Sequence, residues 1–274
     1  MAALETGTEH LLARREGAVA VLTFNRPEAR NALTPSMYDG FATVLPVIAA
    51  DPSIRSVLLT GAGGAFCAGG DVKSMATRQA PGSAGGPSVE DRVDDLRRRQ
   101  ESVSLALHEF PKPVVGAIPG PAAGAGLSIA LSCDVRIMAD DAFLTTAFAR
   151  VGFSGDFGGS WFLSQLVGTA VARELYFTAR RVPAAEALAL GLTNRVAPSA
   201  GFAEAALDFA SELAAGPPIA LRLMKENLNR ALHHELKECL AAEAVAMTRT
   251  GQTSDHKEAA KAFVEKRQPS FDGR

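Results

Sequence analysis

The sequence predicts an α/β protein with an all-helical C-terminal segment. Over roughly the first 200 residues, short apolar and partly β-branched stretches alternate with helical patterns, an order typical of α/β folds. From Phe202 onward every periodic stretch is helical. We therefore expect an α/β core over residues 1–200 and a helical segment over residues 201–274.

Each predicted element begins or ends at a local signal. The apolar stretch 19–24 is stopped by Asn25-Arg26-Pro27, which predicts a strand followed by a loop. Thr34-Pro35 is an N-cap followed by proline at the first helical position, so a helix is expected from there to about Asp51. The same patterns predict strands at 56–60, 113–118 and 134–138, and helices at 90–110, 127–132, 158–167, 169–178 and 183–190. The C-terminal helices are expected at 202–215, 218–229, 233–249 and 255–267.

Composition and charge exclude several classes of function. The chain has 28 Lys and Arg against 30 Asp and Glu, a net charge of −2, whereas nucleic-acid and membrane-surface proteins carry a basic excess. The three cysteines and five histidines show no metal-ligand spacing, so no metal site is expected. No apolar run reaches the ~18 residues of a membrane span, and no signal pattern opens the chain. We expect a cytoplasmic protein.

Two loops that follow predicted strands are dense in Gly and Ala, namely residues 61–70 and 120–126. Small residues let the backbone approach a ligand, with main-chain N–H groups as donors, and the second loop opens directly into a helix. Together the loops could form a two-donor site for a developing oxyanion. Either loop alone is as well explained by a tight turn. Dinucleotide and phosphate-loop fingerprints are absent, and the stretch around Ser128 misses the last glycine of a nucleophile elbow.

Six segments in order resemble the motifs of the crotonase superfamily, the enoyl-CoA hydratase/isomerase group. They are residues 25–33, 61–71, 118–134, 155–160, 184–192 and 262–269. The resemblance covers roughly residues 10 to 270. It implies a ClpP-like spiral of ββα turns, a helical C-terminal segment that serves trimerisation, and a homotrimer or dimer of trimers. It also implies an acyl-CoA substrate, with no separate cofactor because coenzyme A is part of the substrate.

The resemblance also assigns roles to individual residues. Family members hold the thioester carbonyl between two backbone N–H groups, which match Gly70 and Ala125, and stabilise a thioester enolate there. Arg26, Arg30 and Lys266, the last from a neighbouring subunit, are candidates for the coenzyme A phosphates, although each could be an ordinary solvated charge. The remaining predicted substrate contacts are Ala32, Phe66, Ala68, Gly69, Asp71, Val72, Ser128 and Phe263.

The catalytic carboxylates of typical hydratases are missing. Their two glutamates would fall at Ser128 and Phe148, and neither a hydroxyl nor a phenyl ring replaces a carboxylate in acid–base catalysis. Asp156 matches a position where some family isomerases carry a catalytic aspartate. Aromatic residues at 153, 157, 161 and 162 would desolvate it and raise its pKa. The alternative is that Asp156 caps the following helix.

The sequence therefore predicts an acyl-CoA enzyme, and among such enzymes an isomerase that shifts a double bond or rearranges a ring, with Asp156 as acid and base. One acid–base group suffices for isomerisation because it carries a proton from one carbon to another. Three alternatives stay open: a hydratase in which Ser128 and Asp156 share a water, a serine hydrolase that uses Ser128, and a non-catalytic acyl-CoA binder.

Overall fold

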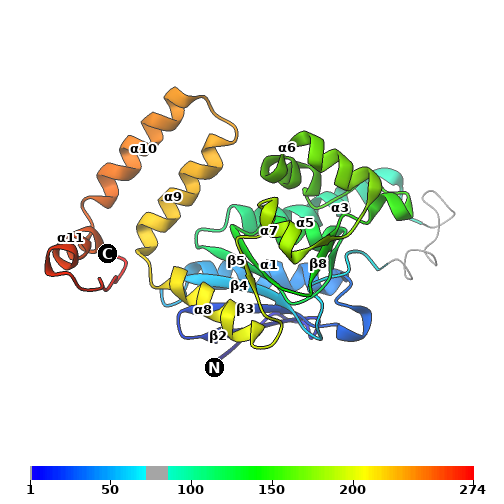
Figure 1. Cartoon of the computed structure of the whole chain (residues 1–274), viewed down its shortest axis with the longest axis horizontal. Coiled ribbons are helices and arrows are strands. Elements are labelled where there is room, and N and C mark those ends of the chain that lie inside the picture. Colours follow the sequence, from blue (N-terminus) through cyan, green and yellow to red (C-terminus); the bar gives the residue numbers. More distant parts are fainter. Residues whose placement is uncertain (1, 72–85) are drawn as a thin grey trace.

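The computed structural model describes residues 2–71 and 86–274, and its centre is a largely parallel sheet (Figure 1). The strands follow the order β1-β2-β3-β4-β5-β7-β10, with β1 and β2 antiparallel to their neighbours and the other pairs parallel. Their bounds are β1 Ala2–Leu4, β2 Leu11–Glu16, β3 Val19–Phe24, β4 Ser56–Gly61, β5 Val114–Ile118, β7 Val135–Ala139 and β10 Arg195–Ala197. A second sheet joins β6 (Ala122–Ala123), β8 (Phe143–Thr145) and β9 (Val182–Pro183).

The helices of the core begin at the signals in the sequence. Thr34 caps α1 (Pro35–Ala50) by accepting a hydrogen bond from the N–H of Met37, and Pro35 occupies the first turn. The other helices of this part are α3 (Val89–Gln100), α4 (Ala106–His108), α5 (Ala125–Ser132), α6 (Gly159–Thr178), α7 (Ala184–Ala189) and α8 (Phe202–Ala214). A π-helical turn, η2 (Glu101–Leu105), joins α3 to α4, and short 3-10 turns lie at η1 (Pro27–Ala29) and η3 (Phe148–Val151).

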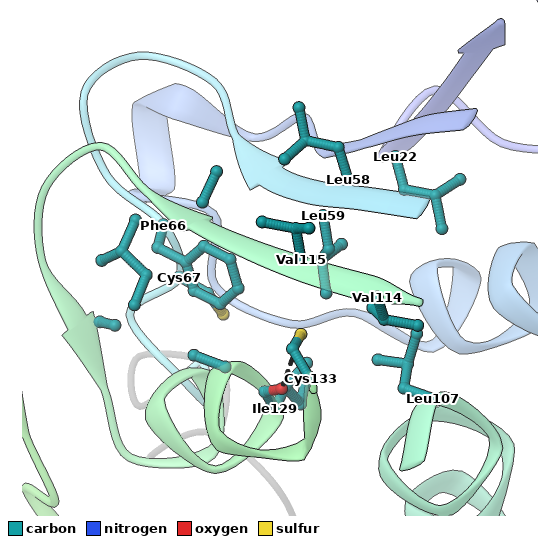
Figure 2. Close-up of a cluster of buried hydrophobic side chains, with 14 of the residues drawn as sticks. Leu22, Leu58, Leu59, Phe66, Cys67, Leu107, Val114, Val115, Ile129 and Cys133 are labelled. Atoms are coloured by element: carbon teal, nitrogen blue, oxygen red, sulfur yellow. Dashed lines mark hydrogen bonds between the residues drawn. The ribbon is translucent and has the colours of Figure 1, made fainter. Parts of the chain in front are cut away.

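The hydrophobic core lies between the sheet and the helices. Figure 2 shows leucine and valine side chains of β3, β4 and β5 above Ile129 of α5 and above Cys133, the residue that follows this helix. Leu22, Leu59 and Val115 are completely buried. Burying one such side chain stabilises the fold by about 1.5–3 kcal/mol.

The structure confirms every strand and helix predicted from periodicity and adds several elements. The additional strands are β1, β2, β6, β8, β9 and β10, most of which are short or lie at a sheet edge. The helices predicted at 158–167 and 169–178 are one helix, α6, interrupted at Gly168, whose φ of 74° is not helical. The helix predicted from Leu127 begins two residues earlier, at Ala125, which places Ala125 at a helix N-terminus.

Three helices follow α8 and extend away from the sheet (Figure 1): α9 (Pro218–Ala231), α10 (Leu236–Thr250) and α11 (Ser254–Glu265). Helix α8 itself packs on the sheet, and Ser56 Oγ donates to the carbonyl of Ala210 at 2.8 Å. The part that leaves the core therefore begins with α9 rather than at residue 201. Lys225 fastens α9 to the core by donating to Asp134 Oδ2 at 2.9 Å and to the carbonyl of Leu107 at 3.1 Å. No helix in the described ranges is long and apolar enough to cross a membrane.

Candidate active site

The two Gly- and Ala-rich loops lie side by side. The N–H of Ala123 donates to the carbonyl of Cys67 at 2.9 Å, and the N–H of Phe66 donates to the carbonyl of Pro121 at 3.0 Å. The approach is close enough that a Cβ on Gly69 would lie 2.7 Å from the carbonyl oxygen of Ala123 and 3.2 Å from the nitrogen of Ala125. Gly69 also has a φ of +85°, so only glycine fits here without strain.

This contact places two backbone donors on one cavity. Ala125 is the first residue of α5, whose N-cap, Gly124, offers no side-chain acceptor, and Gly70 follows the tight turn at Gly69. No acceptor among residues 2–71 and 86–274 receives the N–H of Gly70 or of Ala125. Both residues line the cavity. Two N–H groups that border one cavity and lack an acceptor in the described chain could hold a developing oxyanion.

The cavity has a volume of about 710 Å³, which suits a small-molecule substrate. Its walls come from the start of α1, from one face of α3, from the two small-residue loops and from the segment between Ala147 and Phe157. Asp156 lies in this wall together with Phe148 and Phe153. The fold thus brings Gly70, Ala125 and Asp156 to a single site although they are far apart in sequence.

Asp156 is a poorly solvated carboxylate. Burial raises its pKa from 3.8 to about 6, the direction expected from the sequence. Its Oδ1 atom is buried and finds no hydrogen-bond partner in the described chain. The capping alternative is wrong, because the N-cap of α6 is Gly158 and no side chain caps that end. Phe153 and Phe157 share the cavity with Asp156, whereas Trp161 and Phe162 line a different one.

The two positions at which hydratases carry glutamates offer no acid–base group. Phe148 is buried and lines the cavity with its ring. Ser128 is 1% exposed, donates from Oγ to the carbonyl of Gly124 at 3.3 Å, and does not line the cavity. Two other carboxylates reach the cavity wall, and each faces an arginine: Asp71 lies 3.6 Å from Arg26, and Asp95 lies 2.5 Å from Arg99.

Arginines supply the positive charge of the cavity. Arg26 lines it and donates from Nη1 to the carbonyl of Ala32 at 2.9 Å, whereas Arg30 is exposed and lies outside the wall. Helix α3 adds Arg92 and Arg99, which belong to no motif of the sequence. The dense charge of residues 90–110 indicates that this helix carries arginines, but not which of them reach the cavity. A helix carries charge on several faces, so only the packed structure identifies the arginines that face a ligand.

The other predicted substrate contacts fall into three groups. Ala68 and Asp71 line the cavity, whereas Ala32 and Gly69 do not. The Phe66 ring is completely buried, packs edge-on against Phe24 with centroids 5.5 Å apart, and therefore serves the core (Figure 2). Val72 lies outside the described residues. Phe263 and Lys266 belong to the end of α11, away from the cavity of their own chain.

Two residues that line the cavity, His10 and Tyr38, belong to no recognisable sequence motif. His10 contacts the hydroxyls of Thr34 and Ser36 through Nδ1 at 3.0 and 2.9 Å, which joins the N-terminal strands to the start of α1. Tyr38 stacks on Phe157 with centroids 5.8 Å apart. Both side chains reach the cavity only because α1 packs beside the Asp156 loop, a tertiary contact that leaves no local sequence pattern.

The fold and the cavity define an α/β enzyme of the crotonase superfamily. The chain belongs to the enoyl-CoA hydratase/isomerase family, whose sequence model matches residues 14–274.

The chain is 35% identical over 259 residues to the short-chain-enoyl-CoA hydratase of Clostridium acetobutylicum, covering 94% of this chain and 95% of that protein. It is also 35% identical over 267 residues to the 1,2-epoxyphenylacetyl-CoA isomerase of Escherichia coli, covering 97% and 99%. The crystal structure of an enoyl-CoA hydratase from Polaromonas sp. JS666 superposes with a TM-score of 0.88 at 35% identity, covering 95% of this chain and 99% of that one. The family acts on acyl-CoA substrates.

Proposed function

We propose that this protein is an enoyl-CoA isomerase in which Asp156 is the acid–base group. The observation that carries the proposal is the composition of the cavity wall. Asp156 is a desolvated carboxylate without a hydrogen-bond partner in the described chain, and the hydratase glutamate positions hold Ser128 and Phe148. A carboxylate with a pKa of about 6 is well matched to taking up and returning a proton near neutral pH.

The proposed mechanism moves one proton along the acyl chain. The N–H groups of Gly70 and Ala125 bind the thioester oxygen of a 3-enoyl-CoA. Asp156 removes a proton from the carbon next to the thioester, and the electron pair moves onto the oxygen as an enolate. The two N–H groups stabilise this charge more strongly than they stabilise the neutral carbonyl, which lowers the barrier. Asp156 then returns the proton at the far end of the former double bond, which yields a 2-enoyl-CoA.

A ring rearrangement is the second candidate reaction. It is favoured by the 35% identity to the 1,2-epoxyphenylacetyl-CoA isomerase of Escherichia coli. The same enolate-stabilising pair and the same single carboxylate would serve it. Hydration finds less support, because water must be activated and a carbon protonated, and Ser128 does not line the cavity and donates its hydroxyl to the carbonyl of Gly124. Its burial likewise disfavours a serine hydrolase.

We also propose assembly into a homotrimer or a dimer of trimers. The helices beyond the core expose large apolar side chains, among them Leu236, Met247, Phe263 and Val264, each more than 70% exposed. A monomer that exposed this set would be prone to association. Assembly would also allow Phe263 and Lys266 of one subunit to approach the cavity of the next. Light scattering should give a mass of three or six chains.

The decisive experiment incubates the protein with short 3-enoyl-CoA, 2-enoyl-CoA and epoxyphenylacetyl-CoA, and follows the products by mass spectrometry. Isomerisation of the first or the third substrate supports the proposal, whereas addition of water to 2-enoyl-CoA as the main reaction contradicts it. Asp156→Asn should lower kcat by about 10²–10⁴-fold and leave the Kd for the substrate within a few-fold. Undiminished turnover in Asp156→Asn would show that another group is the base.

A further inference from the structure

Both tyrosines of the protein lie against the loop that carries Asp156. The chain contains two, Tyr38 and Tyr176. Tyr38 stacks on Phe157 and lines the active-site cavity. Tyr176 belongs to α6 and lines neither that cavity nor the one at Trp161. An effect of Tyr176 on the reaction must therefore act through a neighbouring residue rather than through contact with the substrate.

The last turns of α6 hold Tyr176 in place. Thr146 Oγ1 donates to the carbonyl of Leu175 at 2.8 Å. Thr145 Oγ1 donates to the carbonyl of Ala179 at 3.0 Å. Because the two bonds lie on either side of Tyr176 along the chain, they fasten this part of α6 to the end of β8.

The hydroxyl of Tyr176 approaches the segment around Asp156. A Cβ on Gly155 would lie 3.2 Å from this hydroxyl, and a Cβ on Gly159 would lie 2.7 Å from it. The two glycines stand on either side of Asp156 in the chain, and the absence of a side chain at both lets the phenol come this close. Phe148 stacks on the tyrosine ring with centroids 5.9 Å apart, which fixes the plane of the phenol.

Two buried polar atoms at this contact have no hydrogen-bond partner in the described chain. They are the hydroxyl oxygen of Tyr176 and Oδ1 of Asp156, and both are shielded from solvent. Oδ2 of Asp156 is not enclosed in this way, so it is the oxygen that can face a substrate. Nearly all buried donors and acceptors are paired, because an unpaired one destabilises the fold. A phenol is a donor and an ionised carboxylate an acceptor, so the two groups can satisfy each other.

The charge of Asp156 acts on groups from two elements. Burial and this charge raise the pKa of Tyr176 to about 12, so the phenol keeps its proton and remains a donor near neutral pH. Burial, with a smaller contribution from the same charge, raises the pKa of Cys67 to about 12, so this thiol stays neutral. The other titratable and charged groups of the cavity wall are His10, Arg26, Asp71, Arg92, Asp95 and Arg99.

Ser128 is the competing acceptor for the phenol. A Cβ on Gly159 would lie 2.3 Å from Ser128 Oγ, so the two hydroxyls approach the same glycine. Ser128 Oγ is neutral and already donates to the carbonyl of Gly124. A hydrogen bond to an ionised group is roughly twice as strong as one between neutral groups. The phenol should therefore pair with Asp156 whenever Asp156 is ionised.

We infer that Tyr176 is a positioning residue, whose hydroxyl donates a hydrogen bond to Oδ1 of Asp156 and leaves Oδ2 to exchange a proton with the substrate. In the described chain no hydrogen bond to Oδ1 opposes rotation of the carboxylate toward the phenol. The bond would fix the direction of the carboxylate and stabilise its ionised form. This inference deepens the proposed function, since it takes Asp156 as the base.

The presence of only two tyrosines makes the hydrogen bond observable by NMR. We would label the tyrosines of the full-length protein with carbon-13 at Cζ, assign the two resonances with Tyr176→Phe, and record spectra across the pH range in which Asp156 titrates. The Tyr176 resonance should shift as Asp156 ionises, and Asp156→Asn should abolish this shift.

A Tyr176 resonance that does not respond to pH, or that responds equally in Asp156→Asn, would overturn the inference. A response that Ser128→Ala abolishes and Asp156→Asn does not would identify the serine as the partner, and would also overturn it. The spectra need no turnover. Undiminished turnover in Asp156→Asn would contradict the proposed base, whereas only the spectra and the pH profile of Tyr176→Phe decide the hydrogen bond.

Tyr176→Phe tests the effect on the reaction. Phenylalanine keeps the ring and its stacking on Phe148, so only the hydroxyl is lost. The midpoint of the fall in kcat/KM at low pH should move upward by about one pH unit, because the ionised carboxylate loses a donor. We expect kcat to fall about tenfold and KM to stay within a few-fold.

Thr178→Val is the matched control for Tyr176→Phe. It removes a hydroxyl from the same helix, where Thr178 is exposed and donates to the carbonyl of Glu174 at 2.7 Å. The midpoint of the pH profile should not move in this variant. If the midpoint also stays at its wild-type pH in Tyr176→Phe, the inference is wrong even where kcat falls, because a purely structural role lowers the rate without changing the pKa of the base.

Discussion

The N–H of Phe157 donates to Oε1 of Gln100 at 2.7 Å, which fastens the loop carrying Asp156 to helix α3. Phe157 has a φ of 50°, a left-handed conformation that costs a non-glycine residue about 1–2 kcal/mol. The hydrogen bond and the stacking of Tyr38 on the Phe157 ring hold it there. The position of the carboxylate that we propose as the base therefore depends on a side chain 57 positions before Phe157 in the chain.

Removing the Gln100 acceptor should misplace Asp156. We expect Gln100→Leu to lower kcat about tenfold or more, because the buried N–H of Phe157 loses its partner and the strained conformation loses its support. Gln100→Glu keeps an acceptor oxygen and should retain most of the activity. Steady-state kinetics with a short substrate measures both, and a Gln100→Leu variant with wild-type kcat would show that this bond does not position the loop.

The kcat/KM of the enzyme should fall as the pH is lowered through the pKa of Asp156. Burial raises the pKa of Asp156 to about 6, and the base must be ionised to accept a proton. The kcat/KM should therefore be constant above pH 7 and fall about tenfold per pH unit well below pH 6. A pH–rate profile measures this, and a profile that stays flat down to about pH 5 would contradict the assignment of Asp156.

The same raised pKa predicts that Asp156 destabilises the protein at neutral pH. An acid with a raised pKa in the folded state opposes folding above that pKa, and the opposition disappears below the unfolded value of 3.8. Asp156→Asn should thus increase the free energy of unfolding by about 1–3 kcal/mol at pH 7 and by much less at pH 4. Denaturant titrations at both pH values test this, with the exposed Asp39→Asn as the control. An equal change at both pH values would mean that desolvation of the charge is not the cause.

A methyl group at Gly69 should disrupt the donor pair. Gly69→Ala would place a Cβ 2.7 Å from the carbonyl oxygen of Ala123 and push apart the two loops that carry the donors. We expect kcat to fall about 10²–10³-fold, the usual effect of losing an oxyanion donor. Gly64→Ala is the matched control, because Gly64 also has a positive φ, of 75°, but has open space at its Cβ position. If both variants lose activity equally, backbone strain rather than displacement of the donors is responsible.

The two arginines of the first motif should differ in their effect on substrate binding. Arg26 lines the cavity and Arg30 does not. Arg26→Ala should raise the Kd for acyl-CoA about tenfold, whereas Arg30→Ala should change it less than about twofold, as is usual for an exposed charge. Calorimetry with crotonyl-CoA distinguishes the two. A larger effect at Arg30 would place the phosphates outside this cavity.

The predictability of the site differed from residue to residue. The two donor loops, residues 61–70 and 120–126, could be anticipated because dense small residues after a strand are a local pattern with a physical cause, whereas the choice of Gly70 and Ala125 within them came from the resemblance to the family. Asp156 required the resemblance to the family, since a single aspartate before a helix is more often a cap, and the structure was needed to show that Gly158 occupies the cap position. His10, Tyr38 and Arg99 could not be anticipated, because their approach to the cavity depends on the packing of α1 and α3 beside the Asp156 loop.

The sequence by itself determined the alternation of strands and helices, the two donor loops and the absence of carboxylates at positions 128 and 148. These are properties of residue type and spacing along the chain, so they do not depend on how the helices and strands pack. The tertiary structure alone decided that Ser128 and Phe66 do not line the cavity, that the helices leave the core at α9, and that Trp161 and Phe162 line a second cavity. The burial of a side chain, and the cavity that it lines, depend on which distant elements pack around it. Local periodicity in the sequence does not indicate those contacts.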